Sequence, residues 1–228
     1  MTGDGVNDAP SIKSADIGVG MGITGTDVTK NVADMVLADD NFATIVSAVE
    51  EGRRIYDNIR KSIQFLLSSN LSEVMAIFTA NLLGFTILKP VHLLWINLVT
   101  DCFPALALSM EKGEKNLMKR PPRKSSDGIF AGGVGFDVVY QGLFVTLLTL
   151  AAYFIGHFME AGRWELTESA DGMTMAFLTM SMCEIFHSFN MRSQHGSTVS
   201  MLLHGSFNKY IFGSTVLSLI TTALVIEV

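Results

Sequence analysis

Three oxygen-bearing side chains interrupt an apolar stretch in the middle of the chain. Asn97, Thr100 and Asp101 stand at i, i+3 and i+4, so an α-helix would place them on one face. Pro104 lacks an N–H group, and within a helix it would free the carbonyl of Thr100 as a further oxygen. Carboxylate, amide and hydroxyl oxygens suit hard cations, so the stretch predicts half of an ion site.

A second apolar segment, residues 65–83, carries Asn70 and Glu73 at i and i+3. Two facing helices could then surround one cation with side-chain oxygens. A carboxylate at the centre of a bilayer costs roughly 3 kcal/mol, and two of them, Glu73 and Asp101, indicate a function. The same spacing also fits an inter-helix hydrogen-bond cluster that only holds the helices together, so both interpretations stay open.

The first ten residues contain a glycine-rich acidic loop, with the sequence TGDGVNDAP from residue 2. Gly3 and Gly5 allow close approach of the backbone to a ligand. The carboxylates of Asp4 and Asp8 suit Mg²⁺, which often shares its coordination with phosphate oxygens. A simple cluster of Asp-Gly and Asn-Asp turns explains the same residues equally well.

The elements that would position this loop are short. Residues 17–21 and 35–38 are apolar and predict strands, and residues 25–33 between them predict a helix. Alternating strands and helices imply a parallel sheet.

A long helix is predicted to follow the sheet. Asp40 or Asn41 can cap a helix that runs to Val49, Gly52 loosens its path, and a longer helix then covers residues 54–83. At 1.5 Å per residue that second helix is about 45 Å long and exceeds the thickness of a bilayer core.

Composition places the chain among membrane proteins. Its 228 residues are 49% hydrophobic, with a mean hydropathy of +0.38, which is too apolar for an ordinary soluble domain. Nothing in the sequence supports nucleic-acid binding, and two cysteines provide neither a metal spacing nor a disulfide framework. We expect about five membrane spans, at residues 65–83, 91–110, 133–158, 173–190 and 210–228.

The charged residues outside these spans predict their orientation. Basic side chains crowd the entry of the first span and the loop 110–130, whereas acidic side chains dominate the segment 159–172. By the positive-inside rule, the basic ends are cytoplasmic and the acidic segment is exterior.

The loop TGDGVNDAP closely resembles the hinge motif of P-type cation-transporting ATPases. The resemblance continues through residues 14–22, 25–26 and 34–40, and it implies the end of a phosphorylation domain with the haloacid-dehalogenase-like, Rossmann-like α/β fold. It implies that Asp4 holds a catalytic Mg²⁺, with Gly3 and Gly5 beside it, and that Asn7 and Asp8 order a phosphorylated aspartate.

The motif D-K-T-G-T of this family is absent from the 228 residues, so the phosphorylated aspartate is expected upstream. The chain therefore resembles the C-terminal part of a pump, and ATP would be bound mainly by the missing N-terminal part. The implied domains are the end of the phosphorylation domain at 1–40, a cytoplasmic helical stalk at 41–61, and a transmembrane domain at 62–228 with the cytoplasmic loop 110–130.

The polar residues of the two apolar segments resemble those of calcium pumps. The resemblance assigns Ca²⁺ ligation to Asn70, Glu73, Asn97, Thr100 and Asp101. The chain differs from this family pattern at one position. Pumps with two calcium sites have a Glu where we align Ser181, and Glu184 lies one turn nearer the cytosol. From Ser181 we expect one Ca²⁺ to be moved per ATP.

Other functions stay open at this stage. Oxygen ligands alone do not distinguish Ca²⁺ from Mn²⁺ or Na⁺. A chain without the phosphorylated aspartate could also be a non-catalytic ion-binding or regulatory membrane subunit. The prediction is a multi-pass protein of a lipid bilayer, the plasma membrane of a prokaryote, that exports Ca²⁺ from the cytosol.

Overall fold

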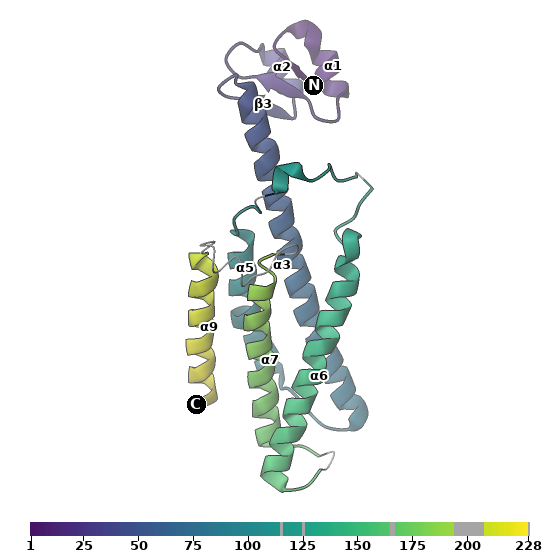
Figure 1. Ribbon diagram of the computed structural model, residues 1–228, viewed down its shortest axis with the longest axis vertical. Coiled ribbons are helices and arrows are strands. Elements are labelled where there is room, and N and C mark those ends of the chain that lie inside the picture. The colour runs from purple at the N-terminus through teal and green to yellow at the C-terminus, as the bar shows by residue number, and fades with distance from the viewer. Residues whose placement is uncertain (115, 125, 165–166, 194–207, 228) are drawn as a thin grey trace. The chain divides into compact units, whose positions relative to one another are not determined.

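The computed structural model describes residues 1–114, 116–124, 126–164, 167–193 and 208–227 (Figure 1). Lys115 and Glu165, which contributed to the predicted orientation of the loops, lie outside the described residues. The chain divides into two compact units, Met1–Arg53 and Arg54–Val228.

The first unit contains a three-stranded parallel sheet in the order β1-β2-β3, which confirms the predicted parallel arrangement. The register pairs Thr2 with Val19 and Val19 with Met35. Both predicted strands and the helix between them are present and slightly shorter than expected. The elements are β1 (Thr2–Gly3), a 3₁₀ turn η1 (Val6–Asp8), α1 (Ala9–Ser14), β2 (Val19–Met21), α2 (Asp27–Val32) and β3 (Met35–Leu37).

Asp40 holds the loop that follows β2. It has a positive φ of 50°, and its carboxylate accepts hydrogen bonds from the backbone N–H groups of Gly22, Ile23 and Thr24 at 2.6, 2.9 and 2.7 Å. These bonds favour the ionised carboxylate, the one from Ile23 most, and lower the pKa of Asp40 from 3.8 to about 2. The loop is therefore tied to the end of β3 by a single carboxylate.

Helix α3 (Phe42–Leu83) begins where the sequence predicts, because the N–H of Ala43 donates to Asn41 Oδ1 at 2.9 Å. The predicted interruption at Gly52 is wrong, since one helix runs without a break through that residue. A glycine inside a helix costs only about 1 kcal/mol relative to alanine, and 42 residues of helix absorb that cost.

The second unit is a bundle of long helices, in which α7 packs against α6, α5 and α9 (Figure 1). The elements after α3 are α4 (Pro90–Trp95), a π-helical segment η2 (Ile96–Asp101), α5 (Cys102–Ser109), two 3₁₀ turns η3 (Leu117–Lys119) and η4 (Ala131–Gly133), α6 (Val134–Ala161), α7 (Ala170–Asn190) and α9 (Lys209–Glu227).

Within the described residues, four helical stretches are long and apolar enough to cross a membrane. They are Phe42–Leu83, Pro90–Ser109, Ala131–Ala161 and Lys209–Ile226. The predicted span at 173–190 forms the helix α7 but is not among the four. The chain is thus a multi-pass helical membrane protein in its larger part.

Helices α6 and α7 approach closely near Gly156 and Gly172. A Cβ atom added to Gly156 would lie 2.8 Å from the Cα of Gly172, and one added to Gly172 would lie 2.8 Å from the carbonyl oxygen of Tyr153. Glycine is needed at both positions, because a side chain would force the two backbones apart. The backbones of α6 and α7 are therefore in close contact at the end of the pair that contains these two glycines.

A buried ion pair stabilises the opposite end of α7. Arg192 and Glu111 are fully buried, and the guanidinium donates to both carboxylate oxygens at 3.1 Å. Asn208 adds a hydrogen bond to Glu111 Oε2 at 2.8 Å, and Lys61 donates to the carbonyl of Arg192 at 2.8 Å. The ends of α5, α7 and α9 are thus joined to α3 through polar groups.

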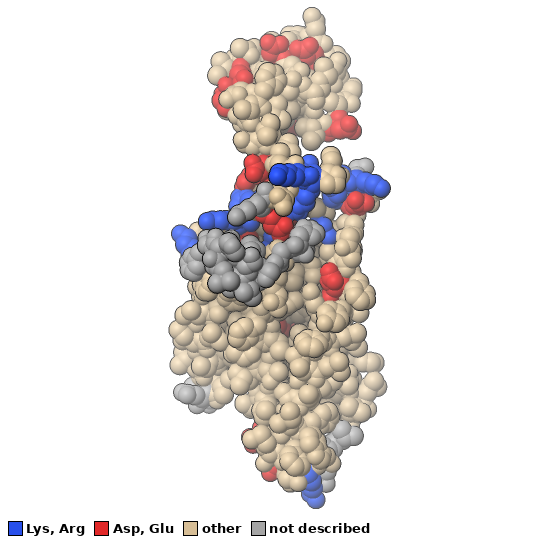
Figure 2. All heavy atoms as spheres, in the orientation of Figure 1, with Lys and Arg blue, Asp and Glu red and all other residues tan. Residues whose placement is uncertain are grey.

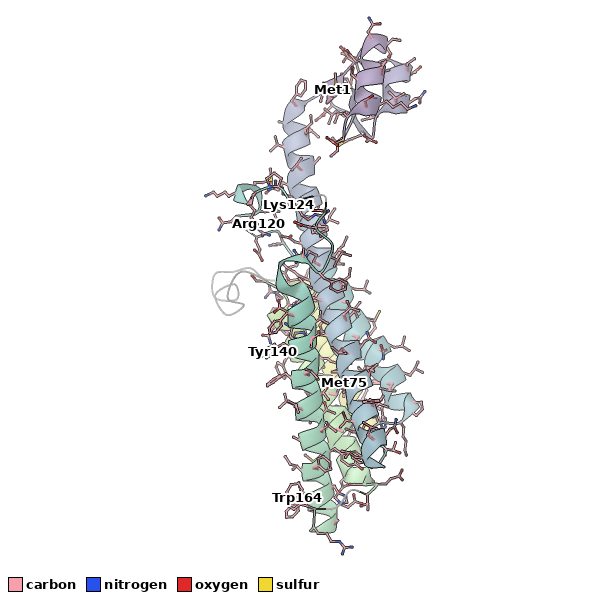
Figure 3. The ribbon with its side chains drawn as sticks, turned by 90° about the vertical axis from the view of Figure 1, so that its right-hand side faces the viewer. Met1, Met75, Arg120, Lys124, Tyr140 and Trp164 are labelled. Carbon is pink, nitrogen blue, oxygen red and sulfur yellow. The ribbon has the colours of Figure 1, made fainter. Side chains whose placement is uncertain are left out.

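Charged side chains mark the two ends of the bundle. Figure 3 shows Arg120 and Lys124 in the loop at one end of the helices and Trp164 at the other. On the face seen in Figure 2, the Lys and Arg side chains gather mainly in a band at one level, and the surface below that band is mainly uncharged. This distribution is the one expected of helices that cross a bilayer.

Candidate cation site

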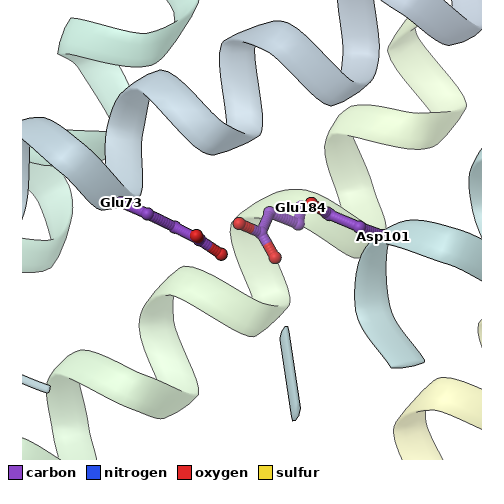
Figure 4. A group of neighbouring side chains, drawn as sticks. All are labelled: Glu73, Asp101 and Glu184. Carbon is purple, nitrogen blue, oxygen red and sulfur yellow. The ribbon is translucent and has the colours of Figure 1, made fainter. Parts of the chain in front are cut away.

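Three carboxylates from three helical elements meet inside the second unit. Glu73 comes from α3, Asp101 from the end of η2 and Glu184 from α7, and all three residues are buried. One carboxylate oxygen of each lies within 4.8 Å of the other two. Figure 4 shows the side chains of Glu73 and Asp101 directed toward Glu184 from opposite sides.

Hydroxyl groups join these carboxylates. Ser69 Oγ lies 2.8 Å from Asp101 Oδ1 and 2.6 Å from Glu184 Oε1. Thr100 Oγ1 lies 2.9 Å from Glu184 Oε2 and also donates toward the carbonyl of Ile96. The predicted residue Thr100 therefore reaches the cluster, together with Ser69, which the sequence did not single out.

Asn97 belongs to the edge of the cluster. Its Nδ2 lies 3.1 and 3.0 Å from the two carboxylate oxygens of Glu73 and 2.9 Å from the carbonyl of Leu93. The amide holds the Glu73 carboxylate in place from η2. Four of the five predicted residues therefore lie in one arrangement with Glu184: Glu73, Asn97, Thr100 and Asp101.

The backbone between Asn97 and Asp101 is not the α-helix assumed from the spacing. Residues Ile96–Asp101 form a π-helix, in which the backbone bonds run from i+5 to i. Ser218 Oγ of α9 donates to the carbonyl of Val99, five residues before Pro104, at 3.2 Å. The freeing of the Thr100 carbonyl by Pro104 stays a prediction.

The structure does not bring Asn70 to the cluster. Its side chain is exposed, and Nδ2 donates to the carbonyl of Leu66 in its own helix at 2.7 Å. The buried face of α3 is defined by Ser69, Ser72 and Glu73, and Asn70 lies about 100° of helix rotation away from Ser69. Spacing from Glu73 alone did not fix which face packs inward.

Glu184 is the residue that the sequence analysis undervalued. The prediction of one Ca²⁺ per ATP rested on Ser181 standing where pumps with two calcium sites have a Glu. Glu184 brings a carboxylate of α7 into the cluster, and the stoichiometry stays a prediction. Ser181 Oγ is buried without a hydrogen-bond partner among the described residues. The signal for Glu184 was available, because a carboxylate inside a mainly apolar helix is costly.

The cluster is suited to a cation. Two like charges 4.8 Å apart repel by about 3.5 kcal/mol at an effective dielectric constant of 20. In the described part of the chain no Lys or Arg forms an ion pair with any of the three carboxylates, and Asp101 Oδ2 is buried without a hydrogen-bond partner. A divalent cation would offset the repulsion and give that oxygen a partner.

The glycine-rich loop of the first unit has a different geometry. Asp4 directly follows β1 at the carboxyl end of the parallel sheet, and its carboxylate is exposed. Asp8 Oδ2 instead accepts the backbone N–H groups of Asp4 and Gly5 at 3.2 and 3.0 Å. A Cβ atom on Gly3 would lie 2.6 Å from the Cβ of Asp8, so Gly3 is needed for this contact.

The loop therefore divides the predicted roles. Asp8 shapes the backbone, and Asp4 and Asn7 extend exposed side chains from it. The open carboxylate of Asp4 fits a Mg²⁺ ion, since this cation takes one or two carboxylates and keeps its other positions for water and phosphate.

Helices long and apolar enough to cross a membrane surround a buried acidic cluster, which defines a membrane protein with a candidate cation site. Residues 85–228 match the family described as "Cation transporting ATPase, C-terminus", and the chain belongs to this family. The resemblance to P-type cation-transporting ATPases that the hinge motif suggested is thereby confirmed.

Several curated relatives cover the whole chain or nearly so. It is 47% identical over 240 residues to "Calcium-transporting ATPase 1" of Bacillus cereus and 45% identical over 228 residues to "Calcium-transporting ATPase" of Bacillus subtilis. It is 38% identical over 251 residues to "Calcium-transporting ATPase 3, endoplasmic reticulum-type" of Arabidopsis thaliana. These alignments cover 99 to 100% of the chain but only 25 to 27% of each relative, so the chain spans about a quarter of their length.

Proposed function

We propose that this chain is the C-terminal part of an ATP-driven pump that exports Ca²⁺ from the cytosol through a phosphorylated intermediate. The observation that carries the proposal is the buried group of Glu73, Asp101 and Glu184, with oxygens within 4.8 Å of one another. The relatives support the choice of ion, since those named above are called calcium-transporting ATPases.

The transported ion would be bound by side chains from three elements. Glu73, Asp101 and Glu184 would supply charge, and Thr100 would supply a neutral oxygen beside them. Asn97 now faces Glu73 with its amide nitrogen and would have to turn its amide to offer an oxygen. Ca²⁺ takes six to eight oxygens, so backbone carbonyls, water or residues of the remaining pump would complete the shell. Asn70, the other predicted ligand, would have to release the carbonyl of Leu66 before it could join.

The phosphorylation chemistry would use the first unit. Asp4 would hold Mg²⁺, which when bound neutralises phosphate charge, and Asn7 would meet the phosphorylated group from the same loop. Asp8 keeps the loop in shape through its bonds to the N–H groups of Asp4 and Gly5. We infer that residues 1–40 end a haloacid-dehalogenase-like domain, whose nucleotide-binding part and phosphorylated aspartate lie upstream.

We also propose five membrane spans, with α7 as the fourth. Helix α7 has 21 residues and packs along α6, which is itself apolar enough to span. Glu184 and other polar side chains lower its hydropathy because it faces the ion site. Residues 41–61 would form a cytoplasmic stalk, residues 62–228 the membrane domain, and the basic loop 110–130 would be cytoplasmic.

The membrane itself is proposed to be the plasma membrane of a prokaryote. Two of the relatives named above come from Bacillus, and the third is an endoplasmic-reticulum type from a plant. Localisation of the full-length protein in its own cell tests this point.

Asp101→Asn in the full-length pump tests the function. Loss of one anionic ligand should abolish Ca²⁺-activated phosphorylation from ATP, and phosphorylation from inorganic phosphate should remain, because the first unit is unchanged. Normal Ca²⁺ activation in the variant would contradict the ion site. Activation of the unmutated protein by Mn²⁺ or Na⁺ in place of Ca²⁺ would instead assign another ion. No phosphorylation of the unmutated full-length protein under any condition would favour a non-catalytic subunit.

A further inference from the structure

Two neighbouring cavities lie along α6 and α7, away from the Gly156–Gly172 crossing. The first has a volume of about 570 Å³ and lies between α3, the start of α6 and the end of α7. The second, of about 460 Å³, lies between α6 and α7 further along both helices. Both are lined by Phe144, Val145, His187 and Asn190, so they form one continuous groove.

The groove changes from polar to apolar along its length. At the end near Arg60 its wall includes Asp137 and Gln141, whereas its other end is lined by side chains such as Leu148 and Leu178. The polar end lies where α6 begins, next to the loop that carries Arg120 and Lys124 (Figure 3). A groove of this kind has its polar end at a bilayer surface and its apolar end in the hydrocarbon.

The polar end carries one positive and one negative side chain. Arg60 Nη2 donates to the carbonyl of Ala131 at 2.7 Å, and Arg60 Nε is buried without a hydrogen-bond partner among the described residues. Asp137 is half-buried in the same wall. In the described part of the chain these two side chains form no ion pair with each other or with another residue.

A ligand that satisfies both groups carries an anion and a hydrogen-bonding cation on an apolar body. Phosphate oxygens would accept from the guanidinium of Arg60, because arginine suits phosphate geometry. A primary ammonium would donate to the carboxylate of Asp137. An acyl chain would lie along Leu148 and Leu178 in the apolar part of the groove.

We propose that this groove binds a zwitterionic phospholipid of the phosphatidylethanolamine class, with its phosphate at Arg60 and its ammonium at Asp137. The site is separate from the carboxylate cluster and does not depend on which ion is transported. Its cavities fall in the size range of small-molecule sites. Bound lipid would fill the space between α6 and α7 that the glycine crossing leaves open at this end.

Native mass spectrometry of the purified full-length protein tests the proposal with four defined lipids. Phosphatidylethanolamine has both charges, phosphatidylglycerol lacks the cation, phosphatidylcholine cannot donate from its ammonium, and diacylglycerol lacks the phosphate. We expect one phosphatidylethanolamine to bind saturably, at least tenfold more tightly than the other three. Equal binding of all four lipids, or preference for phosphatidylglycerol, would overturn the proposal.

Variants assign the two contacts. Arg60→Gln should weaken binding of every phosphate-bearing lipid, and Asp137→Asn should reduce phosphatidylethanolamine to the affinity of phosphatidylglycerol. The matched controls Lys124→Gln and Asp127→Asn change the same types of charge in the loop and should leave binding unchanged. If phosphatidylethanolamine still binds to both groove variants, the lipid is bound nonspecifically around the helices, and the groove site is contradicted. The headgroup preference is measured on the unmutated protein, so it remains decisive if a variant does not fold.

Discussion

Replacement of Glu184 by Gln is the sharpest test of the cation site, because it removes charge and keeps shape. Glu184 is buried, and it accepts hydrogen bonds from Ser69 at 2.6 Å and from Thr100 at 2.9 Å. In the variant, Ser69 can still donate to the amide oxygen. The amide nitrogen can donate to Thr100 Oγ1, whose own hydrogen goes to the carbonyl of Ile96. The hydrogen bonds therefore survive, and the change is mainly electrostatic.

The size of the effect follows from the distances. Ionised carboxylates within 4.8 Å of each other repel by about 3.5 kcal/mol or more per pair, and Glu184→Gln removes every such pair that includes Glu184. The ion-free protein should therefore be stabilised or unaffected. The bound cation loses a charged ligand, and we take as the scale of that loss the net contribution of a hydrogen bond to a charged group, about 1.5 to 3 kcal/mol. The dissociation constant for Ca²⁺ should rise by about 10- to 150-fold.

Two measurements on the full-length protein separate these effects. Calcium binding gives the affinity directly, and thermal unfolding in a chelator and in Ca²⁺ gives the stability of each state. We expect an unchanged or higher midpoint in the chelator and a smaller increase on adding Ca²⁺. Glu50→Gln, at an exposed position in the first unit, is the matched control and should behave like the unmutated protein. An affinity within twofold of the unmutated protein would refute the assignment of Glu184, and so would a midpoint that falls in the chelator.

Two further predictions concern stability. Arg192→Met leaves the buried carboxylate of Glu111 without its guanidinium partner and should destabilise the full-length protein by about 3 to 5 kcal/mol in denaturant titrations. The double variant with Glu111→Gln should recover part of that loss, and full additivity of the two changes would argue against the pair. Because hydrogen bonds lower the pKa of Asp40 from 3.8 to about 2, its ionised carboxylate stabilises the first unit above about pH 4, and this contribution is lost as the pH falls toward 2. Asp40→Asn should therefore speed amide exchange at Gly22–Thr24 near neutral pH and have little effect near pH 2; an equal effect at both values would contradict this role.

The sequence identified the residues of the candidate cation site better than it predicted the directions of their side chains. Carboxylates inside apolar segments identified Glu73 and Asp101, and the same criterion applied evenly would have added Glu184. The prediction instead gave weight to Ser181, which stands where the family has a Glu. Spacing could not show where the side chain of Asn70 points, because the rotation of α3 is set by the helices packed against it, and those contacts are not visible in a local pattern.

The π-helical conformation of the backbone at Ile96–Asp101 could also not be predicted from side-chain spacing. The i, i+3, i+4 argument for Asn97, Thr100 and Asp101 assumed an α-helix, whereas the structure has a π-helix whose Val99 carbonyl accepts a hydrogen bond from Ser218, more than 100 residues away. In contrast, the parallel pairing of β2 and β3 followed from the alternation of strand and helix patterns, and the cap at Asn41 depends on adjacent residues; both were predicted correctly.

The position of Ser69 has a consequence for how the site works. Its hydroxyl carries one hydrogen, yet its oxygen lies within hydrogen-bond distance of both Asp101 and Glu184. Without a cation, the two short contacts can both be attractive only if one carboxyl group also carries a proton. A cation that enters must displace that proton, because oxygen ligands bind metals in their deprotonated form. At the cation site proposed above, the cation and a proton would therefore compete for the same buried oxygens, and release of the cation would be accompanied by proton uptake at this cluster.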